Sequence, residues 1–380
     1  MATIEPYETK SGRRYMVRYR TPDRRPTKKR GFKTKRDAQD WAANNTVQMN
    51  TGTWRPAAAG RITVNEAAQA WLTAKSATVA PKTLTAYEQA VDRIKNIGTI
   101  GRVRLVDVDH EVVEQWVIAM SLHTVRGGDR MAPKTIRNTF SVLSGVMKRA
   151  IRDKRIPANP CEGVDLPKAT SRDKTILSPA DVATMAAAAG DYADHVNALA
   201  MAGLRWGELA GLQVQDVDLE KRRLRINRQI TENKGKLIHG LPKHDKRRTV
   251  PIIQPLAAIL ETRVEGKTRD ELVFPTTGGA AMWPGNARRD WFDPAATAAG
   301  YPKLTPHELR HTFASVAISA GANVKALQHA LGHHSAAFTL DEYGHLFPDD
   351  MDTFVNAMSS RFTGDCAQSV PTKKETGHDG

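Results

Sequence analysis

The chain has 380 residues and a formal charge of +15, with 56 Lys and Arg against 41 Asp and Glu. This length allows two or three domains, each with its own core, and the charge favours a polyanionic partner. No apolar stretch approaches the roughly 20 residues of a membrane span. The first residues lack the order of a signal peptide, and the two cysteines do not have a metal-ligand spacing. The sequence therefore predicts a protein of the reducing cytoplasm, without disulfides and without a membrane partner.

Basic residues concentrate in residues 1–60, which hold 14 Lys and Arg against five Asp and Glu. Apolar side chains alternate with this charge over residues 13–20, which predicts a strand, and a second strand is expected near 28–32. Thr34 then caps a helix. Residues 1–58 are therefore expected to form a strand–strand–helix module that binds DNA. Its candidate DNA-binding residues are Arg18, Arg20, Lys28, Lys29 and Arg30.

Residues 62–155 carry a helical pattern throughout. N-caps and first-position prolines mark the helix starts. They lie at Thr63, Pro81, Asp109 and Pro133. Four helices of this length predict a compact bundle.

Two lysines of this bundle follow the prolines that open its long helices. Lys82 and Lys134 lie near helix N-termini, where a lysine is unfavourable unless an anion is bound. Phosphate at a helix N-terminus would supply that anion. Both are candidate DNA contacts, and a solvated lysine is the alternative interpretation of each.

The remainder of the chain predicts a third domain. Residues 156–172 are rich in Pro and Gly and are expected to be an interdomain linker. The third domain is expected over 173–363, and a polar, disordered tail over 364–380. The chain as a whole is predicted to be mainly α with small β-sheets, an α+β fold with a mixed α/β third domain.

Within the third domain, helices and short strands alternate. Ser178 caps a helix, and Gly203 ends the next helix. Strand-like segments follow at 223–230 and 249–253, and the chain is helical again from Thr305.

A dispersed set of polar residues indicates one chemistry. The set comprises Arg205, Lys243, His307, Arg310, His333 and a late tyrosine, Tyr343. Guanidinium groups bind phosphate through paired N–H donors. A tyrosine becomes a competent nucleophile when two guanidiniums stabilise the phenolate and a pentavalent phosphate. The set therefore predicts transesterification of a phosphodiester through a protein–phosphate ester.

The helix that contains His307 and Arg310 has a clear start. Thr305 is its cap, Pro306 takes the first position and Glu308 the third. His307 and Arg310 are expected on one face, at the rim of a buried stripe. The predicted stripe comprises Leu309, Phe313, Val316, Ala317 and Ala320.

The same segment has a second interpretation. His307-Glu308-Leu309-Arg310-His311 matches the H-E-x-x-H pattern of zinc hydrolases, and Glu342 is available as a third ligand. However, an arginine within one turn of a dication raises the electrostatic cost of metal binding. Ala314 also stands where the extended zinc pattern has glycine. We favour the phosphodiester chemistry, and a chelator separates the two hypotheses.

Five segments, taken in order, resemble the tyrosine recombinases, and phage integrases among them. They are Gly203-Leu204-Arg205-Trp206-Gly207-Glu208-Leu209, a lysine in the turn before the strand at 249–253, His307-Glu308-Leu309-Arg310-His311, Leu331-Gly332-His333, and Tyr343. Chance agreement of five segments in the right order is far rarer than any single match. By the same resemblance, residues 62–155 are a helical core-binding domain of the SAM-like type, and residues 1–58 an arm-binding domain.

The resemblance implies how the phosphate would be held. Arg205 and Arg310 would clamp the scissile phosphate, and Glu208 would support Arg205. His333 would hydrogen-bond the phosphate, with the neighbouring His334 as the alternative.

The resemblance also implies how protons and bonds would move. Tyr343 would form a 3′-phosphotyrosine, and His307 would assist proton transfer. Lys243 would be the general acid that protonates the leaving 5′ oxygen, with Lys246 as its alternative. The ester stores the bond energy, so no metal, ATP or other cofactor is implied.

By this resemblance the chain is expected to be a site-specific DNA recombinase that integrates and excises a phage genome. It would act as a homotetramer on core-type and arm-type attachment sites, through a Holliday junction, in the cytoplasm of a bacterial host. A host DNA-bending factor and an excisionase would be partners, and the segment from Phe347 to Phe362 would join subunits. The alternatives are a DNA-binding protein that does not cut, and a resolvase or chromosome-dimer recombinase.

Overall fold

The computed structural model describes residues 2–52, 54, 60–125, 127–168, 174–242, 247–346, 355 and 358–359. The chain divides into two compact units, Met1–Arg172 and Asp173–Gly380. Among the described residues, no helix is long and apolar enough to cross a membrane. The tail expected over 364–380 lies outside the described residues, as does all but three residues of the expected inter-subunit segment.

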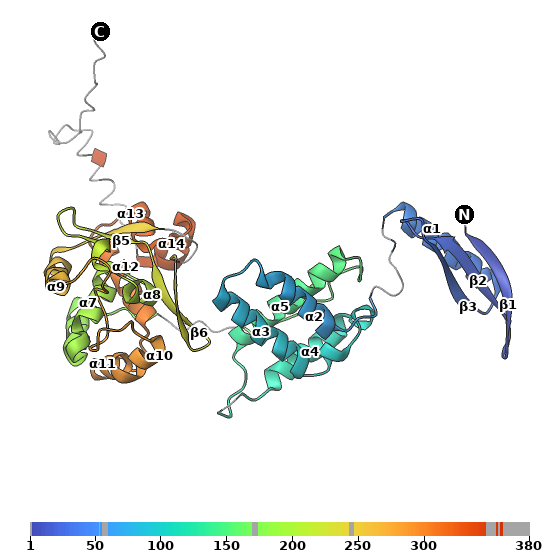
Figure 1. The fold of residues 1–380 in the computed structure, drawn as a ribbon, viewed down its shortest axis with the longest axis horizontal. Coiled ribbons are helices and arrows are strands. Elements are labelled where there is room, and N and C mark those ends of the chain that lie inside the picture. Colours follow the sequence, from blue (N-terminus) through green and yellow to red (C-terminus); the bar gives the residue numbers. More distant parts are fainter. Residues whose placement is uncertain are drawn as a thin grey trace, which may run out of the picture. The chain divides into compact units, whose positions relative to one another are not determined.

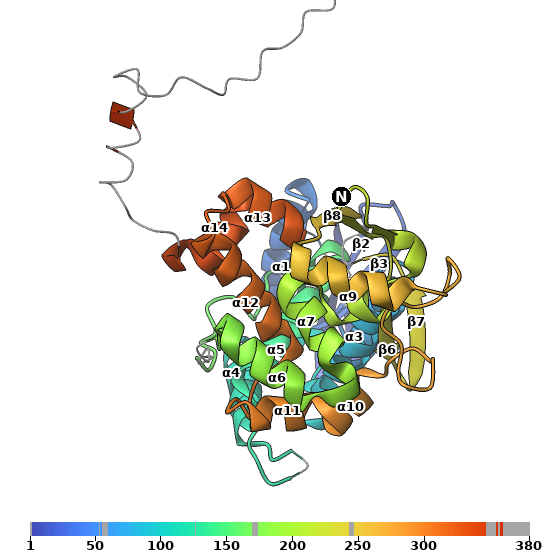
Figure 2. The ribbon, with the colours of Figure 1, turned by 90° about the vertical axis from the view of Figure 1, so that its left-hand side faces the viewer.

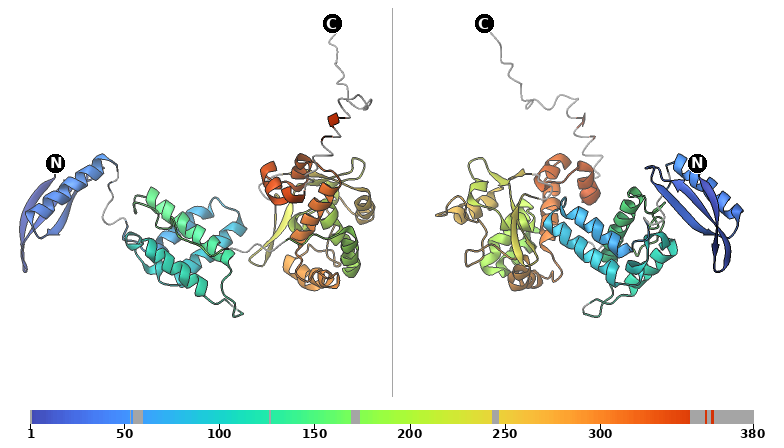
Figure 3. Two further views of the ribbon diagram at one scale, coloured as in Figure 1. Left: turned by 180° about the vertical axis from the view of Figure 1, so that it is seen from behind. Right: turned by 45° about the vertical axis from the view of Figure 1, so that its right-hand side comes forward.

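The N-terminal module is a three-stranded antiparallel sheet with one helix, visible in Figures 1 and 3. Its strands are β1 (Thr3–Thr9), β2 (Gly12–Arg20) and β3 (Pro26–Phe32), in the order β1-β2-β3, and its helix is α1 (Lys35–Asn50). Trp41 of α1 packs on Tyr19 and Phe32, with ring centroids 5.2 Å and 5.8 Å away. Both predicted strands and the predicted helix are present, and β1 is a further strand that was not predicted. Its Pro6 weakens a strand signal, although proline is tolerated on an edge strand.

The predicted helical bundle is present. It comprises α2 (Val64–Ser76), α3 (Pro81–Asn96), α4 (His110–Leu122) and α5 (Pro133–Arg152). Each helix begins where its cap or its first-position proline predicts. Trp116 and Leu143 lie in a core that these helices share.

The expected linker begins later than residue 156. Ile156 and Cys161 are 3% and 5% exposed and belong to the bundle core. Arg137 Nε also donates to the carbonyl of Pro167, 2.8 Å away. These residues extend the helical module, because their apolar side chains fill the space beside α5 rather than facing solvent.

The second unit is built mainly from helices around a common core (Figure 2). They are α6 (Pro179–Ala188), α7 (Ala193–Ala202), α8 (Trp206–Ala210), α9 (Gln254–Val264), α10 (Pro284–Ala287), α11 (Asp293–Ala298), α12 (Pro306–Ser319), α13 (Val324–Leu331) and α14 (Ala336–Tyr343). Ser178 and Thr305 both form the predicted capping boxes. In Figure 2, α12, α13 and α14 gather at one side of the unit.

Two small sheets complete this unit. One has the order β4-β5-β8, from β4 (Val217–Asp218), β5 (Arg223–Ile226) and β8 (Arg248–Pro251), and the other is the hairpin of β6 (Gln229–Asn233) and β7 (Lys236–Gly240). The single strand expected over 223–230 is therefore two strands in different sheets. Lys234 and Gly235 both have positive φ, as a two-residue hairpin turn requires.

Gly203 determines how α7 ends and how closely it approaches α12. Its φ of +59° is left-handed, and its N–H donates to Leu199. A Cβ at this position would lie 2.4 Å from Cδ1 of Phe313, which is on α12. Only glycine therefore allows both the turn and this close approach. The approach brings the segment that carries Arg205 beside the helix that carries Arg310.

We predict that Gly203→Ala destabilises the chain by about 2–4 kcal/mol in urea unfolding, because left-handed strain adds to overpacking. Gly190→Ala is the matched control, since Gly190 also has positive φ (+55°) but no atom within 4 Å of a Cβ. It should lose only the backbone contribution, about 1 kcal/mol. Equal losses in the two variants would mean that the contact with Phe313 contributes nothing.

Candidate active site

A buried carboxylate lies at the centre of the site. Glu208, in the first turn of α8, is fully buried and receives hydrogen bonds from two arginines. Arg205 binds it through its backbone N–H (2.9 Å) and through Nη1 (2.8 Å). The N–H contact caps α8, and the Nη1 contact orients the guanidinium. Gly207, between them, lies against β6, where a Cβ would be 2.7 Å from the carbonyl oxygen of Ile230.

The second arginine that donates to Glu208 is Arg248, which was not among the predicted site residues. It lies in β8 and makes a bidentate pair with Glu208 through Nη1 and Nη2, each at 2.7 Å. Its Nε donates to the carbonyl oxygen of Ala330, 2.8 Å away. Arg248 therefore ties β8, α8 and α13 together. The available signal was its place at the start of a strand, in a run of charge that otherwise predicts a solvated turn.

The charge of Glu208 is maintained by these arginines. Burial alone would raise the pKa of its carboxyl group, but the hydrogen bonds and charge of Arg248, followed by the charge of Arg205, hold the pKa at about 2. Glu208 therefore carries a full negative charge at neutral pH, and it orients two guanidiniums.

Arg310 reaches the same place from α12. It is 1% exposed, and its Nη1 donates to the carbonyl oxygen of Gly203 at 2.7 Å. Its Nη2 donates to the carbonyl oxygen of Leu331. Burial, followed by the charges of Arg205 and Arg248, lowers the pKa of Arg310 to about 9. The charge of one carboxylate, Glu208, therefore acts on three guanidiniums, of which it contacts two, and the excess positive charge suits an anionic substrate.

The Leu-Gly-His segment connects the two predicted arginines. Arg205 Nη2 donates to the carbonyl oxygen of Gly332 (3.4 Å), which is next to the Leu331 carbonyl that Arg310 contacts. Gly332 has φ of +63° and ends α13. A Cβ there would lie 2.8 Å from Cδ of Arg248. The glycine of this segment is therefore required both by its turn and by the closeness of Arg248.

His333 follows directly and faces the tyrosine. Its ring is nearly parallel to that of Tyr343, with centroids 6.2 Å apart and an interplanar angle of 4°. Its Nδ1 lies 3.0 Å from the hydroxyl of Thr339. Burial and the charges of Arg310 and Arg205 lower the pKa of His333 to about 4. The ring is neutral at pH 7, with Nδ1 engaged by Thr339. The alternative, His334, is exposed and packs on Phe338 instead.

Tyr343, at the end of α14, is buried. It is 2% exposed, and its hydroxyl lies 2.7 Å from Nδ1 of His311. Burial raises the pKa of Tyr343 to about 12, against the lowering effect of Arg310. His311 is the second residue that the sequence analysis did not assign to the site. Its spacing of four from His307 placed it on the same helical face, which was the available signal.

His307 and Lys174 complete the surroundings of the tyrosine. His307 is exposed at the start of α12, and its ring centroid is 4.9 Å from that of His311. Lys174 pairs with Glu342 at 2.6 Å, and its ammonium lies 5.8 Å from the Tyr343 ring centroid. The segment before α6 therefore contacts the end of α14.

The predicted general acid cannot be placed in the same way. Lys243 and its alternative Lys246 both lie outside the described residues, in the connection between β7 and β8. Arg248, the first residue of β8, lies in the site. The connection therefore ends beside the site, and the role of Lys243 stays a prediction.

The structure gives Glu308 a different role from the one that the zinc hypothesis assigns to it. Glu308, which would be the general base of a zinc hydrolase, caps its own helix through Thr305 N–H (2.7 Å) and accepts from the N–H of Thr175 (3.1 Å). In the ranges that the structure describes, no three His, Cys, Asp or Glu side chains are grouped to hold one metal ion.

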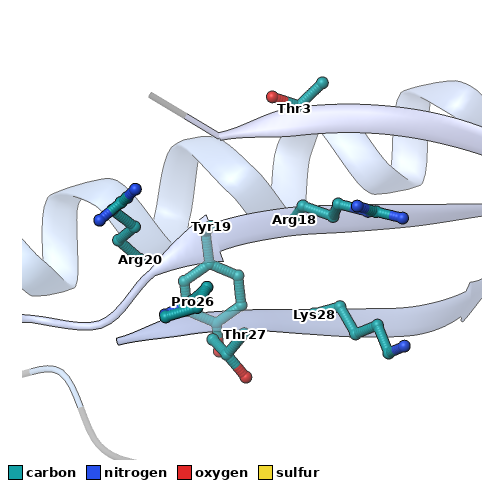
Figure 4. Close-up of a pocket in the computed structure, with 7 residues that line it drawn as sticks. All are labelled: Thr3, Arg18, Tyr19, Arg20, Pro26, Thr27 and Lys28. Atoms are coloured by element: carbon teal, nitrogen blue, oxygen red, sulfur yellow. The ribbon is translucent and has the colours of Figure 1, made fainter. Parts of the chain in front are cut away.

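The predicted DNA-binding residues of the N-terminal module divide between two faces of its sheet. Lys28 lies opposite Arg18, and Lys29 opposite the buried Val17. Because side chains alternate along a strand, Lys28 and Arg18 share the face away from α1, whereas Lys29 belongs to the other. Arg20 and Arg30 lie on the same open face as Lys28 by this register. Figure 4 shows Arg18, Arg20 and Lys28 in a pocket at one end of the sheet.

Lys82 and Lys134 are exposed at the second positions of α3 and α5. Both helices begin without a side-chain cap and without an acidic residue in the first turn. Their N-termini therefore offer free N–H groups and a positive charge to solvent.

Two known protein families match parts of this chain. Residues 177–349 match the phage integrase family, and residues 7–49 match an arm DNA-binding domain. The integrase of Mycobacterium phage L5 is 27% identical over 317 residues, covering 80% of this chain and 82% of that protein. The part of the chain from residue 177 to residue 349 belongs to the phage integrase family. The tyrosine recombinase XerC of Mycobacterium bovis is 29% identical to this family member over 248 residues, covering 60% of this chain and 76% of that protein.

The fold of this family member is also that of solved integrases. The Tn1549 transposon integrase, in complex with a circular intermediate DNA, superposes with a TM-score of 0.67. The match covers 79% of this chain and 99% of that chain at 21% identity. It confirms the predicted tyrosine recombinase architecture.

We predict that Glu208→Gln destabilises this integrase by about 3 kcal/mol at pH 7, because the buried guanidinium of Arg248 and the partly buried one of Arg205 lose their counter-charge. The folded pKa of about 2 lies below the ordinary value of 4.5, so the wild-type contribution is complete above pH 4.5 and is lost as pH falls towards 2. The difference between wild type and variant in urea unfolding should therefore shrink below pH 4.5.

Asp290→Asn is the control for this prediction, because Asp290 pairs with Arg289 at the surface, where both side chains are more than half exposed. Its effect should stay below about 1 kcal/mol. A Glu208→Gln loss that does not change between pH 7 and pH 3 would contradict the assignment of the charge to Glu208.

Proposed function

We propose that this chain, a site-specific tyrosine recombinase, integrates a phage genome at attachment sites by cutting and rejoining DNA through a phosphotyrosine. One observation carries this proposal. Arg205 and Arg310 come from separate elements, yet they donate to the neighbouring carbonyl groups of Gly332 and Leu331, and the next residue, His333, has its ring parallel to that of Tyr343. This cluster has more positive than negative charge, which suits a phosphodiester.

In the proposed reaction, the phenol oxygen of Tyr343 attacks the scissile phosphorus, and the bond to the 5′ oxygen breaks. Arg205 and Arg310 stabilise the pentavalent phosphate as negative charge develops on it. Lys243 gives a proton to the leaving 5′ oxygen, and His333 donates to a phosphate oxygen. Attack of another strand's 5′ hydroxyl on the phosphotyrosine reverses these events, so no metal, ATP or other cofactor enters.

In this reaction the hydroxyl of Tyr343 must come within bonding reach of the phosphate. In the structure Tyr343 is 2% exposed and bonded to His311. Its hydroxyl therefore reaches a phosphate only if α14 shifts or the phosphate enters beside it. We propose that binding of DNA causes that rearrangement.

Three groups of residues support DNA binding in this proposal. The open face of the N-terminal sheet would contact arm-type sites, and Lys82 and Lys134 would contact phosphates of the core site. Arg205 and Arg310 would hold the phosphate that is cut. The active form would be a homotetramer that passes through a Holliday junction in the cytoplasm of a bacterial host, where a DNA-bending factor and an excisionase set the direction of recombination.

We predict that Tyr343→Phe abolishes covalent attachment to DNA. The test incubates the full chain with a nicked duplex of the attachment region that adjoins its gene, in EDTA, and looks for a protein–DNA band that resists SDS. Wild type should give the band, because the phenol oxygen bonds directly to phosphorus and needs no metal. Phenylalanine keeps the ring and removes the hydroxyl, so binding of the same DNA should persist.

The other results of this experiment each reject the proposal. A covalent band in Tyr343→Phe would assign the nucleophile to another residue. No band from wild type, together with a specific shift of the same DNA, would indicate a protein that binds without cutting. Cleavage that EDTA abolishes would favour the zinc hydrolase.

We predict that Lys28→Ala weakens arm DNA binding whereas Lys29→Ala does not. The two residues are adjacent and lose the same charge, but by the register of β2 and β3 they lie on opposite faces. Loss of one phosphate contact should lower the slope of log affinity against log salt by about 1. Fluorescence anisotropy on arm-site DNA at several salt concentrations measures this slope. Equal slopes in the two variants would exclude the open face as the contact surface.

A further inference from the structure

The contact between Tyr343 and His311 has a chemical direction. A phenol hydroxyl can donate or accept a hydrogen bond. The negative charge of Glu342 favours the His311 tautomer whose Nδ1 is the acceptor, and this Nδ1 lies 2.7 Å from the hydroxyl. An imidazole whose Nδ1 accepts must carry its proton on Nε2. That Nε2 faces Oε1 of Glu342 at 3.9 Å. The three side chains thus form a line from phenol to imidazole to carboxylate.

The charged groups around His311 keep its ring neutral. On its own helix it faces His307 and Arg310, from the segment before α6 it faces Lys174, and from α14 it faces Glu342 and Tyr343. Burial, followed by His307 and Lys174, lowers the pKa of His311 to about 4, while Glu342 acts in the opposite sense. At pH 7 the His311 ring is therefore neutral.

The other histidines of the site are placed differently. Nδ1 of His333 is engaged by the hydroxyl of Thr339. His307 is exposed at the first turn of α12, whereas His311 is 5% exposed. A proton acceptor for a phenol must lie within hydrogen-bond reach of it, and His311 meets this requirement in the structure.

We propose that His311 is the general base that takes the proton of Tyr343 during DNA cleavage. The inference rests on the proposed function, because it assumes that Tyr343 is the nucleophile. As the Tyr343 oxygen forms its bond to phosphorus, its proton moves to Nδ1 of His311, and the electron pair of the breaking bond leaves with the 5′ oxygen. In the reverse step, the His311 imidazolium returns the proton to the phenolate that leaves phosphorus.

Glu342 has a positioning role in this arrangement. Its carboxylate, 3.9 Å from Nε2 of His311, favours the tautomer in which Nδ1 accepts, and it lies within ion-pair distance of the imidazolium that forms. Lys174 holds the same carboxylate at 2.6 Å. The pKa of the Glu342 carboxyl is lowered: burial opposes this shift, and the hydrogen bond and charge of Lys174 outweigh it. Glu342 is therefore ionised when His311 receives the proton.

The contrasting interpretation is that His311 only stores the tyrosine in a buried position. A storage role and a proton-transfer role make opposite predictions for one variant. In His311→Asn, Oδ1 replaces Nδ1 as the hydrogen-bond acceptor, but an amide oxygen does not take up a proton at neutral pH. Storage would persist in this variant, and general-base catalysis would be lost.

The experiment uses the full chain and a nicked attachment-site duplex with sulfur in place of the 5′ bridging oxygen at the scissile phosphate. A thiolate is a good leaving group that needs no proton, so the rate of covalent attachment reports activation of the tyrosine alone. Tyr343→Phe should give no product on this DNA. A wild-type product that Tyr343→Phe lacks supports the proposed function, whatever His311→Asn does.

We expect His311→Asn to form the covalent complex at least about 100-fold more slowly than wild type at pH 7, with unchanged DNA affinity. Its rate should rise about tenfold per pH unit between pH 7 and 9, because hydroxide must then remove a proton whose pKa is about 12. The wild-type rate should stay flat over that range, since His311 is already deprotonated. A flat profile at the wild-type rate in His311→Asn would overturn the proposal.

Glu342→Gln provides a second measurement if His311→Asn lowers the melting temperature. This variant keeps His311 and Tyr343 and removes the charge that faces the imidazolium. Covalent attachment to the sulfur-containing DNA should slow by about tenfold. A rate equal to that of wild type would also count against proton transfer to His311.

Discussion

The pairing of one buried carboxylate, Glu208, with two guanidiniums is the interaction on which the phosphate-binding side of the site depends. Arg205 follows α7, Arg248 begins β8, and Arg248 also contacts the carbonyl of Ala330 at the end of α13. A single negative charge therefore fixes three segments that are far apart in the chain. Loss of one partner from a buried ion pair costs more than the pair itself contributes, because the remaining charge is left in a poorly solvated place.

The same pairing leaves the site with more positive than negative charge. Arg310 donates to carbonyl groups rather than to a carboxylate. Burial, followed by the charges of Arg205 and Arg248, lowers its pKa. Such an arrangement lowers the stability of the folded protein, and it suits the negatively charged pentavalent phosphate of the proposed reaction. Backbone carbonyl groups at Gly203, Leu331 and Gly332 orient the guanidiniums. The geometry is therefore present before DNA arrives.

Local signals in the sequence predicted the helix starts. Caps depend on residues within one turn, so the sequence alone identifies them; they include Thr34, Thr63, Asp109, Ser178 and Thr305. The order of the motifs predicted which polar residues would meet. The segment 223–230 was harder, because the division of strands between two sheets depends on pairing with distant partners.

What the sequence could not predict depended on tertiary contacts. Arg248 reads as part of a solvated charge run, and only the position of Glu208 makes it a buried ligand. The predicted stripe of α12 was wrong at Val316, which is 41% exposed, and at Ala320, which is also exposed. Arg310 and His311 are buried instead. A periodicity of apolar residues places polar side chains at the rim of a core. It does not predict that Arg310 and His311 will be buried through hydrogen bonds to carbonyl groups and a phenol of other elements.

The burial of Tyr343 also bears on how a recombinase avoids reacting with DNA outside its own site. A phenol that is covered by its neighbours and protonated well above neutral pH is a poor nucleophile towards any phosphate that passes by. A recombinase searching a genome meets an enormous number of phosphodiesters before it meets its own site. With Tyr343 as the proposed nucleophile, its burial in the resting fold would keep the protein from bonding covalently to the DNA that it meets before its own site.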